Sequence, residues 1–303
     1  MLLFSAFSFL TCKITERKPV SVPSGFDWQG HRGCRGLFPE NSIPAFLHAL
    51  EYPEVVTLEL DLAVSKDRQL IVSHEPWLNP AICRDAQGQE IEEKEIENYL
   101  IFRQTAAELR ACDCGSWGNT RFPQQTKTKT HKPTLREVVE AVDRLYPEKQ
   151  IRWNLEIKSN PSWDGTRTPP IQEFVALVLK EINSLLLNDR ACVQSFDVRP
   201  LQLLHEQAPQ LPLAFLVENT DGLDQNLERL GFSPTIFSPY YLLVSSSLVK
   251  KCARKGIKLI PWTVNEVPAM RRLIRLGVDG IITDYPNLID QVGKKEGKTV
   301  KRN

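Results

Sequence analysis

The sequence has almost no net charge, since 38 lysines and arginines face 37 acidic residues. No global field would draw such a chain to nucleic acid or to an anionic membrane, so any attraction for phosphate must be local. A zinc motif is also lacking, because one residue separates Cys112 from Cys114 and no second pair of thiols or histidines follows. What remains is a chain of 303 residues and 42% hydrophobic content, which can bury a large core in one domain.

The seven cysteines are interpreted mostly as small buried side chains. A disulfide among Cys83, Cys112 and Cys114 stays open if the protein is exported, because disulfides persist in oxidising compartments.

Long hydrophobic runs are lacking as well. Residues 1–10 are apolar but much shorter than the roughly 20 residues that span a bilayer. They resemble a bacterial lipoprotein leader with Cys12 as the lipidated residue, although no lysine or arginine precedes them as a secretory signal requires. We expect a leader or flexible tail at 1–24 and a disordered, charged tail at 293–303. The expected location is the bacterial cell envelope, and the cytoplasm is the alternative.

Between these ends, short β-rich segments alternate with helix-like patterns at 134–145, 171–187, 246–255 and 267–276. Alternation over this length favours a closed TIM (β/α)8 barrel across residues 25–292 over an open sheet. The nine expected strands lie at 26–31, 55–64, 69–74, 151–158, 191–196, 213–217, 235–238, 258–264 and 280–283.

The ninth strand is explained by a hairpin, because only four residues separate the second expected strand from the third. That is too few for a crossover helix, so the two strands must pair antiparallel and leave eight for the barrel. A two-residue turn at 67–68 would place Asp61 opposite His74, on the face that also carries Glu59. A three-residue turn would shift the register by one and turn His74 away.

Charged residues gather where strands would end at the barrel mouth, the place of active sites in this architecture. Glu156 and Lys158 share one face of their strand, opposite an apolar face. His31 follows Gly30, and Gly33 permits the turn that would let His31 and Arg32 reach one ligand. Carboxylates, cations and imidazoles together suit phosphate diester chemistry, which needs charge neutralisation, a base and an acid.

The order of these motifs resembles the glycerophosphodiester phosphodiesterase family from about Trp28 to Pro286. Singly the motifs are weak, but in this order and separation they are specific. They are HRG and PEN after residue 30, E-x-D at 59–61, the hairpin ending in His74, E-x-K at 156–158, Gln194-Ser195-Phe196 and Trp262-Thr263-Val264-Asn265.

The resemblance implies a TIM-type barrel that hydrolyses glycerophosphodiesters to sn-glycerol 3-phosphate and an alcohol. It implies one divalent cation, Ca²⁺ or Mg²⁺, and a small insertion at about 75–117, after the second and third strands, that shapes the alcohol pocket. The implied roles are metal ligands for Glu59, Asp61 and Glu156, catalysis for His31 and His74, and phosphate contacts for Arg32 and Lys158.

From the chemistry of these residues we expect metal-assisted in-line displacement at phosphorus, with the glycerol 2-hydroxyl as nucleophile and, as a hypothesis, a cyclic phosphate intermediate. His31 is the preferred base and His74 the preferred acid, and the reverse order stays open. Two alternatives remain: a related barrel phosphodiesterase acting on lysophospholipid or sphingomyelin, or a non-catalytic envelope protein that binds glycerophosphodiesters. The expected partner is the small-molecule substrate, without nucleic acid, and with membrane contact only through a lipid anchor at Cys12.

Some residues carry weaker expectations. Glu75 stands where the family usually has aspartate, which leaves the orientation of the preceding histidine in question. Phe196 and Trp262 are expected as core or pocket wall, and Glu40 and Asn41 as support for His31 or for a helix that begins near residue 42. The basic run at 126–132 lacks interleaved aromatic residues and is interpreted as a solvated loop, not as a nucleic-acid surface.

Overall fold

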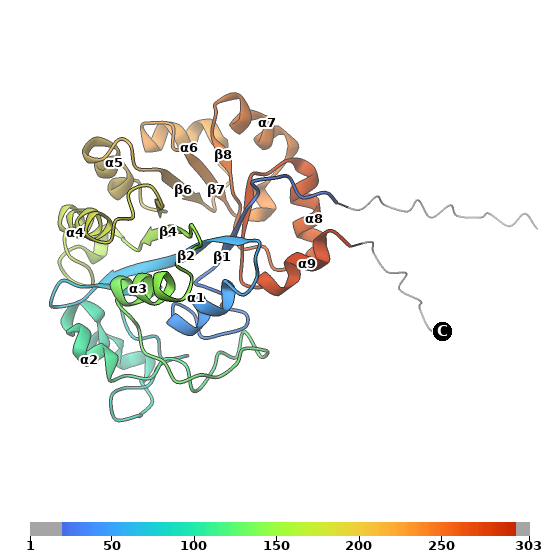
Figure 1. Cartoon of the computed structure of the whole chain (residues 1–303). Helices are drawn as coiled ribbons and strands as arrows, with labels where there is room; N and C mark the ends of the chain where they lie inside the picture. Colours follow the sequence, from blue (N-terminus) through green and yellow to red (C-terminus); the bar gives the residue numbers. More distant parts are fainter. Residues whose placement is uncertain (1–19, 295–303) are drawn as a thin grey trace, which may run out of the picture.

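A computed structural model describes residues 20–294 and confirms the barrel (Figure 1). Eight parallel strands lie side by side in the order β8-β7-β6-β5-β4-β2-β1-β9. They are β1 (Asp27–Gly30), β2 (Val55–Val64), β4 (Arg152–Ile157), β5 (Ala191–Ser195), β6 (Leu213–Val217), β7 (Ile236–Pro239), β8 (Lys258–Leu259) and β9 (Gly280–Thr283).

Backbone hydrogen bonds close the barrel between β9 and the segment after β8. Ile282 N donates to Pro261 O at 3.0 Å, and Val264 N donates to Ile282 O at 2.9 Å. The strand expected over 258–264 is regular only at 258–259, and Pro261 has no N–H with which to continue a ladder. The rest of that segment nevertheless stays beside its neighbours.

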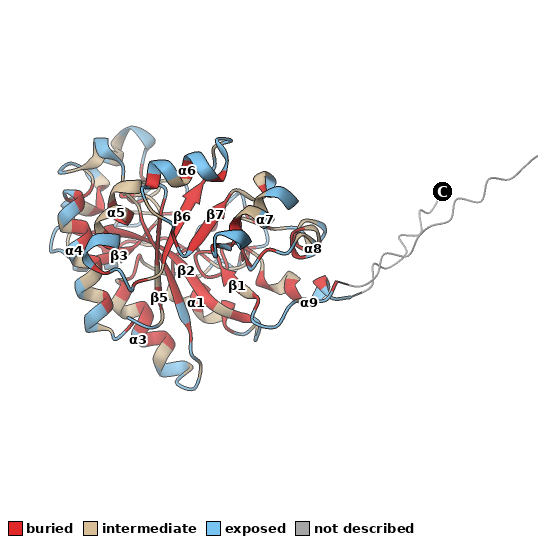
Figure 2. Ribbon diagram, turned by 90° about the horizontal axis from the view of Figure 1, so that it is seen from above, coloured by how far each residue is buried: buried red, intermediate tan, exposed pale blue. Residues whose placement is uncertain are grey.

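One outer helix follows each barrel strand, when β2, its hairpin and the small segment before residue 135 are counted as one unit. The helices lie outside the strands and expose their outward faces (Figures 1 and 2). They are α1 (Ile43–Ala49), α3 (Leu135–Leu145), α4 (Ile171–Ser184), α5 (Val198–Gln207), α6 (Gly222–Leu230), α7 (Ser246–Arg254), α8 (Val267–Leu276) and α9 (Ile289–Val292).

Alternation along the strands places apolar and polar side chains on opposite faces. In β2, Leu58, Leu60 and Leu62 are fully buried in the main hydrophobic core, while Glu59 and Asp61 point the other way. The strands therefore form a buried centre (Figure 2), and the polar faces of β2 and β4 are left to build a site.

The hairpin between β2 and β3 (Leu70–Val72) is antiparallel as expected, but the predicted register is wrong by one residue. Leu62 pairs with Val72, and Ser65 N bonds to Gln69 O, so the turn has three residues. Arg68 closes it at φ 62°. A left-handed residue at this position is typical of three-residue hairpins, where glycine is the usual signal, and this sequence has arginine.

The segment between β3 and α3 forms a small unit with its own core beside the barrel (Figure 1). It holds the short helices η1 (Glu93–Tyr99), η2 (Ile101–Arg103) and α2 (Ala106–Arg110). Cys83 and Cys114 form a disulfide within it. Cys112 is buried in the same core but unbonded, and the other described cysteines are buried or half-buried.

The expected leader and tail fall mostly outside the described residues, as does Cys12 with its expected lipid anchor. Within residues 20–294, no helix combines the length and apolar character needed to cross a bilayer.

Candidate active site

A cleft of about 1430 Å³, its open mouth included, lies at the C-terminal ends of the barrel strands. This is the end at which (β/α)8 barrels carry their active sites. Asp61 and Asn41 are fully buried and contact residues of the cleft. The predicted site residues that line the cleft are His31, Arg32, Glu40, Glu59, His74, Glu156, Lys158, Phe196 and Trp262.

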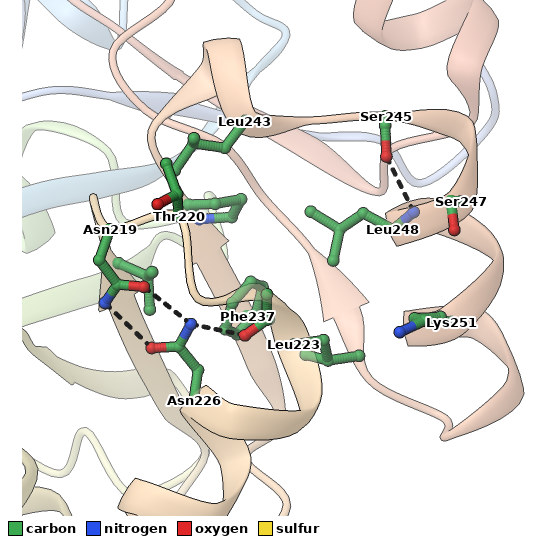
Figure 3. A pocket seen from close by; sticks show the side chains of 13 residues that line it. Asn219, Thr220, Leu223, Asn226, Phe237, Leu243, Ser245, Ser247, Leu248 and Lys251 are labelled. Carbon is green, nitrogen blue, oxygen red and sulfur yellow. Dashed lines mark hydrogen bonds between the residues drawn. The ribbon is translucent and has the colours of Figure 1, made fainter.

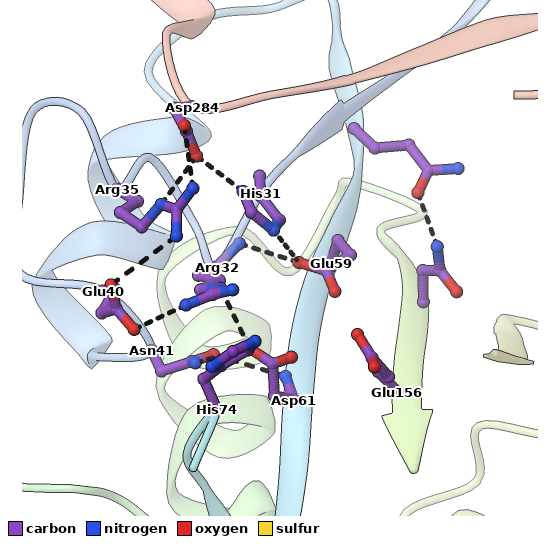
Figure 4. A network of polar contacts seen from close by, with 12 residues as sticks. His31, Arg32, Arg35, Glu40, Asn41, Glu59, Asp61, His74, Glu156 and Asp284 are labelled. Carbon is purple, nitrogen blue, oxygen red and sulfur yellow. Dashed lines mark hydrogen bonds and ion pairs between the residues drawn. The ribbon is translucent and has the colours of Figure 1, made fainter. Parts of the chain in front are cut away.

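Three carboxylates from two neighbouring strands meet in this cleft (Figure 4). Asp61 of β2 pairs in register with Glu156 of β4, and Glu59 lies two residues earlier on the same face of β2. One ligand oxygen from each residue lies within 4.8 Å of the other two. The parallel pairing of β2 with β4 therefore brings together carboxylates that the sequence had placed on separate strands.

The donor set of these three carboxylates fits a hard divalent cation. Burial raises the pKa of Glu59 well above its usual value, and the charges of Asp61 and Glu156 raise it further. Asp61 Oδ1 is buried without a hydrogen-bond partner among the described residues. Ca²⁺ and Mg²⁺ take oxygen ligands of this kind. A cation held here would relieve the repulsion and provide the missing partner.

Two cations flank the carboxylates. Arg32 Nη1 donates to Glu40 at 2.8 Å, and Arg32 Nε lies 3.2 Å from Asp61 Oδ2. Lys158 Nζ donates to Glu156 Oε1 at 2.8 Å and lies 3.9 Å from Asp61 Oδ1. Burial alone would raise the pKa of Asp61, but positive charge, mainly from Arg32, holds it well below its usual value. Because both cations line the cleft, they can reach an anion bound in it.

Arg32 reaches the carboxylates because β1 ends at Gly30 and the chain turns, as predicted. Arg32 and Gly33 both adopt positive φ, at 50° and 83°. A Cβ on Gly33 would lie 2.6 Å from the backbone of Ala45, so only glycine fits there. The turn also aims Arg32 N at Glu59 Oε2, 2.9 Å away.

His31 is oriented by an aspartate that the sequence analysis missed. Asp284, directly after β9, lies 2.6 Å from His31 Nδ1 and is itself held by Arg35 (Figure 4). Asn265 Nδ2 also donates to Asp284, at 2.7 Å. Burial lowers the pKa of His31 to about 4, although the charge of Asp284 opposes this shift. We assign the proton of the neutral ring to Nδ1 because a carboxylate accepts there. Nε2, 3.8 Å from Glu59, is then free to accept a proton.

His74 reaches the same cleft although the predicted register was wrong. The chain bends after β3, which places His74 Nε2 3.1 Å from Lys158 Nζ. His74 Nδ1 lies 2.8 Å from Glu75 Oε1. Burial alone would raise the pKa of Glu75, but the hydrogen bond from His74 and the positive charge nearby, including Arg32 and Lys132, together outweigh it and the pKa falls to about 2. The longer glutamate therefore still orients the ring.

Glu40 and Asn41 support the site differently from the expectation. Glu40 binds Arg32, and Asn41 Nδ2 donates to Asp61 Oδ2 at 2.8 Å. The helix cap is Ser42, whose hydroxyl accepts from the backbone of α1 at 3.3 Å.

Aromatic rings form part of the cleft wall. Phe196 and Trp262 meet edge to face, with ring centroids 5.3 Å apart. Trp262 is anchored by a hydrogen bond of 2.8 Å from its indole nitrogen to Ser238 O. The segment between β3 and α3 adds Asn79 and residues 119–121 to the lining, so this segment shapes the cleft.

Comparison with known proteins identifies the family of this chain. The model of the glycerophosphoryl diester phosphodiesterase family matches residues 31–288. The chain belongs to this family. A glycerophosphodiester phosphodiesterase of Caldanaerobacter subterraneus is 31% identical over 88% of this chain and 97% of its own length. One from Bacillus altitudinis is 30% identical over 85% and 94%. A solved structure from Silicibacter pomeroyi DSS-3 that carries the family name matches with a TM-score of 0.79 and 32% identity, over 90% and 94% of the two chains.

The family match includes residues that the sequence analysis did not single out. Asp284 comes directly after β9, just as Lys158 comes directly after β4. Its position at the end of a strand could therefore have marked Asp284 as a candidate site residue. Gln194 was noted only as part of a motif, yet its amide donates to Glu59 Oε1 at 2.8 Å. The interpretation of residues 126–132 as a solvated loop is wrong at Lys132, which is buried with only 2% of the residue exposed. No local pattern indicated that this lysine turns inward.

A second hollow of about 650 Å³ lies between the loops after β6 and β7 (Figure 3). Its amides are occupied with each other, since Asn219 and Asn226 exchange hydrogen bonds of 3.1 Å. Ser245 caps α7, and Lys251 binds Asp224 at the surface. None of the residues lining this hollow is a carboxylate or a histidine, so the larger cleft is the better candidate for catalysis.

Proposed function

We propose that this protein hydrolyses glycerophosphodiesters to sn-glycerol 3-phosphate and a free alcohol, with the aid of one divalent cation. The observation that carries the proposal is that three carboxylates, two cations and two oriented histidines share one cleft of a family barrel. The relatives named for this activity support the choice of substrate class.

Glu59, Asp61 and Glu156 would hold the cation, Ca²⁺ or Mg²⁺. When bound, it would polarise a phosphoryl oxygen and lower the pKa of a coordinated hydroxyl. Arg32 and Lys158 bind the phosphate and offset the charge that grows on its oxygens as the bond to the alcohol breaks.

His31 acts as the base in the first step. Its Nε2 takes the proton of the glycerol 2-hydroxyl while that oxygen forms a bond to phosphorus. Asp284 supports this role, because a proton fixed on Nδ1 leaves Nε2 as the acceptor and the carboxylate stabilises the imidazolium that forms.

His74 acts as the acid. As the bond from phosphorus to the head-group oxygen breaks, that oxygen takes a proton from His74 Nε2, and a five-membered cyclic phosphate remains. In the second step His74 takes a proton from water, the water oxygen bonds to phosphorus, and His31 returns a proton to the 2-hydroxyl oxygen as its bond breaks. The net change is addition of one water to the diester.

The test is release of glycerol 3-phosphate from glycerophosphocholine, followed with and without EDTA. We expect turnover that EDTA abolishes and added cation restores. His31→Ala and Glu156→Gln should each lower kcat by more than about 100-fold, a loss typical of catalytic groups. The exposed Glu228→Gln serves as the matched control and should keep full activity. Full activity of the wild type in EDTA, or of either site variant, would refute the proposal.

The same assay separates the alternatives. Faster turnover of lysophosphatidylcholine or sphingomyelin than of glycerophosphocholine would favour the lipid-acting alternative. Tight binding without turnover in any cation would favour the non-catalytic alternative. In a quenched-flow time course, a cyclic species that rises and then decays supports the two-step path, and its absence would indicate direct attack by water.

We also propose that the protein works in the bacterial cell envelope. The disulfide between Cys83 and Cys114 supports an oxidising compartment. The test is fractionation of cells that express the full chain, compared with Cys12→Ala. Recovery of the wild type from the membrane and of the variant from the soluble envelope fraction would support an anchor, whereas recovery of both from the cytoplasm would contradict it.

A further inference from the structure

Lys132 is the one buried lysine in the described part of the chain, and its ammonium has no hydrogen-bond partner there. Removing an ammonium from water costs several kcal/mol unless nearby charge compensates. By contrast, Lys127 and Lys129 of the same basic run are exposed. The burial of Lys132 is costly, and the other lysines of the run avoid it, so the cause must lie in the surroundings of Lys132.

The backbone places Lys132 beside the strand that leads to the second histidine. Val72 N, at the end of β3, donates to Pro133 O at 2.8 Å, and Ile71 forms a β-bridge with Thr134. Lys132 is therefore held next to the point where the chain leaves β3 for His74. It does not line the cleft, so it does not touch the substrate.

The charges around Lys132 link it to the support of His74. Burial lowers the pKa of Lys132, and the carboxylates of Glu40 and Glu75 are the main groups that oppose this shift. Arg32 and Asp61 are the other charged groups that act on it. Lys132 in turn helps to lower the pKa of both Glu40 and Glu75.

Glu40 would keep Arg32 and Arg35 if Lys132 were lost, but Arg32 would be the one arginine or lysine left to act on Glu75, and it already binds Glu40 and lies against Asp61. Glu75 Oε2 is buried with no hydrogen-bond partner among the described residues, so the geometry of Glu75 depends on its bond to His74 and on nearby charge. Loss of the ammonium would therefore leave Glu75 free to take up a proton or to turn toward Arg32.

We propose that Lys132 is a positioning residue for the hydrolysis proposed above, because its ammonium keeps Glu75 as a carboxylate against His74 and thereby holds one ring proton of His74 on Nδ1. Nε2 then stays directed at the cleft and carries the second ring proton, which His74 gives up as the acid. Lys132 belongs to the segment between β3 and α3, so that segment tunes the histidine as well as shaping the cleft.

The first test reads the histidine directly and needs no turnover. In metal-free protein, ¹⁵N chemical shifts report which ring nitrogen of His74 carries the proton. At a pH where the ring is neutral, we expect the Nδ1–H form in the wild type and in the exposed control Lys129→Met. Lys132→Met should shift His74 to a mixture of the two forms, as Glu75→Gln should. An unchanged His74 signal in Lys132→Met would overturn the proposal.

The second test asks whether Lys132 and Glu75 act together. We expect Lys132→Met to lower kcat by about 10- to 100-fold with little change in KM, the range seen when the support of a functional histidine is removed. The double variant with Glu75→Gln should be no slower than Glu75→Gln alone. If the two losses multiply, Lys132 acts independently of Glu75 and the proposal fails.

Controls separate positioning from folding. Thermal unfolding first establishes that Lys132→Met is folded. If that variant does not fold, Lys132→Gln is used in its place. Lys132→Arg, which keeps the charge, should recover part of kcat. An inactive wild type would refute the proposed function while the ¹⁵N result still decides the role of Lys132.

Discussion

Replacing Glu59 by glutamine and Asp61 by asparagine should change the stability of the metal-free protein in opposite directions. Burial raises the pKa of Glu59 well above its usual value, and repulsion from Asp61 and Glu156 raises it further. Asp61 is the carboxylate that cations hold, with Arg32 Nε at 3.2 Å and Lys158 Nζ at 3.9 Å. The two ligands are therefore unequal before any cation binds.

The distances set the magnitude. Two unit charges 4.8 Å apart repel by about 3.5 kcal/mol at an effective dielectric constant of about 20. Glu59 escapes part of this repulsion by holding its proton more tightly, and glutamine gives up one acceptor, so the net gain from Glu59→Gln should be about 1–2 kcal/mol. Asp61→Asn leaves buried cations without their partner and should cost about 3–5 kcal/mol.

The assay is urea denaturation in EDTA at pH 8, with Glu228→Gln as the matched surface control. Both site variants should also lose the upward shift in stability that Ca²⁺ or Mg²⁺ gives the wild type. The reasoning is refuted if Glu59→Gln is less stable than the wild type without metal, or if either variant keeps the full metal-induced shift.

Three further predictions concern groups around the carboxylates. The pKa of His31 falls from 6.5 to about 4 on folding, so the unfolded chain binds more protons between these pH values and the folded state loses stability as the pH falls from 6.5 to 4. In EDTA at pH 4, His31→Gln should therefore have lost about 3 kcal/mol less of its free energy of unfolding than the wild type. Equal acid sensitivity of the two proteins would contradict the shift. Asp284→Asn should lower kcat by about 10²- to 10⁴-fold with an unchanged fold, since it removes the carboxylate that accepts the proton of His31 Nδ1. An unaffected kcat would show that this contact is dispensable. Loss of the disulfide, by reduction or in the double variant Cys83→Ser with Cys114→Ser, should lower the free energy of unfolding by about 3–4 kcal/mol, because the bond joins residues 31 positions apart. Identical urea midpoints for the reduced and oxidised protein would argue against the bond.

Local periodicity was enough to predict the barrel. Alternation within β2 and β4 separated their apolar faces from Glu59, Asp61 and Glu156, because strand side chains have a period of two whatever the tertiary context. The turn after Gly30 was also predictable, since Gly33 is the local signal for it.

Contacts made by backbone geometry or between distant segments could not be predicted in this way. The hairpin register depends on Arg68 at positive φ, and arginine gives no signal for that conformation. The partnership of Asp284 with His31 joins residues 253 positions apart and follows only from the pairing of β1 with β9. The burial of Lys132 depends on how its segment packs beside β3, which its polar neighbours in sequence conceal.

The most direct test of the central claim is to measure cation binding and diester cleavage on the same protein. Calorimetric titration of the EDTA-treated and dialysed wild type should show one divalent cation per chain, and glycerophosphocholine hydrolysis should return in proportion to the occupied fraction. Glu156→Gln should lose both. Hydrolysis at the full rate with no cation bound, or undiminished binding by Glu156→Gln, would contradict the account.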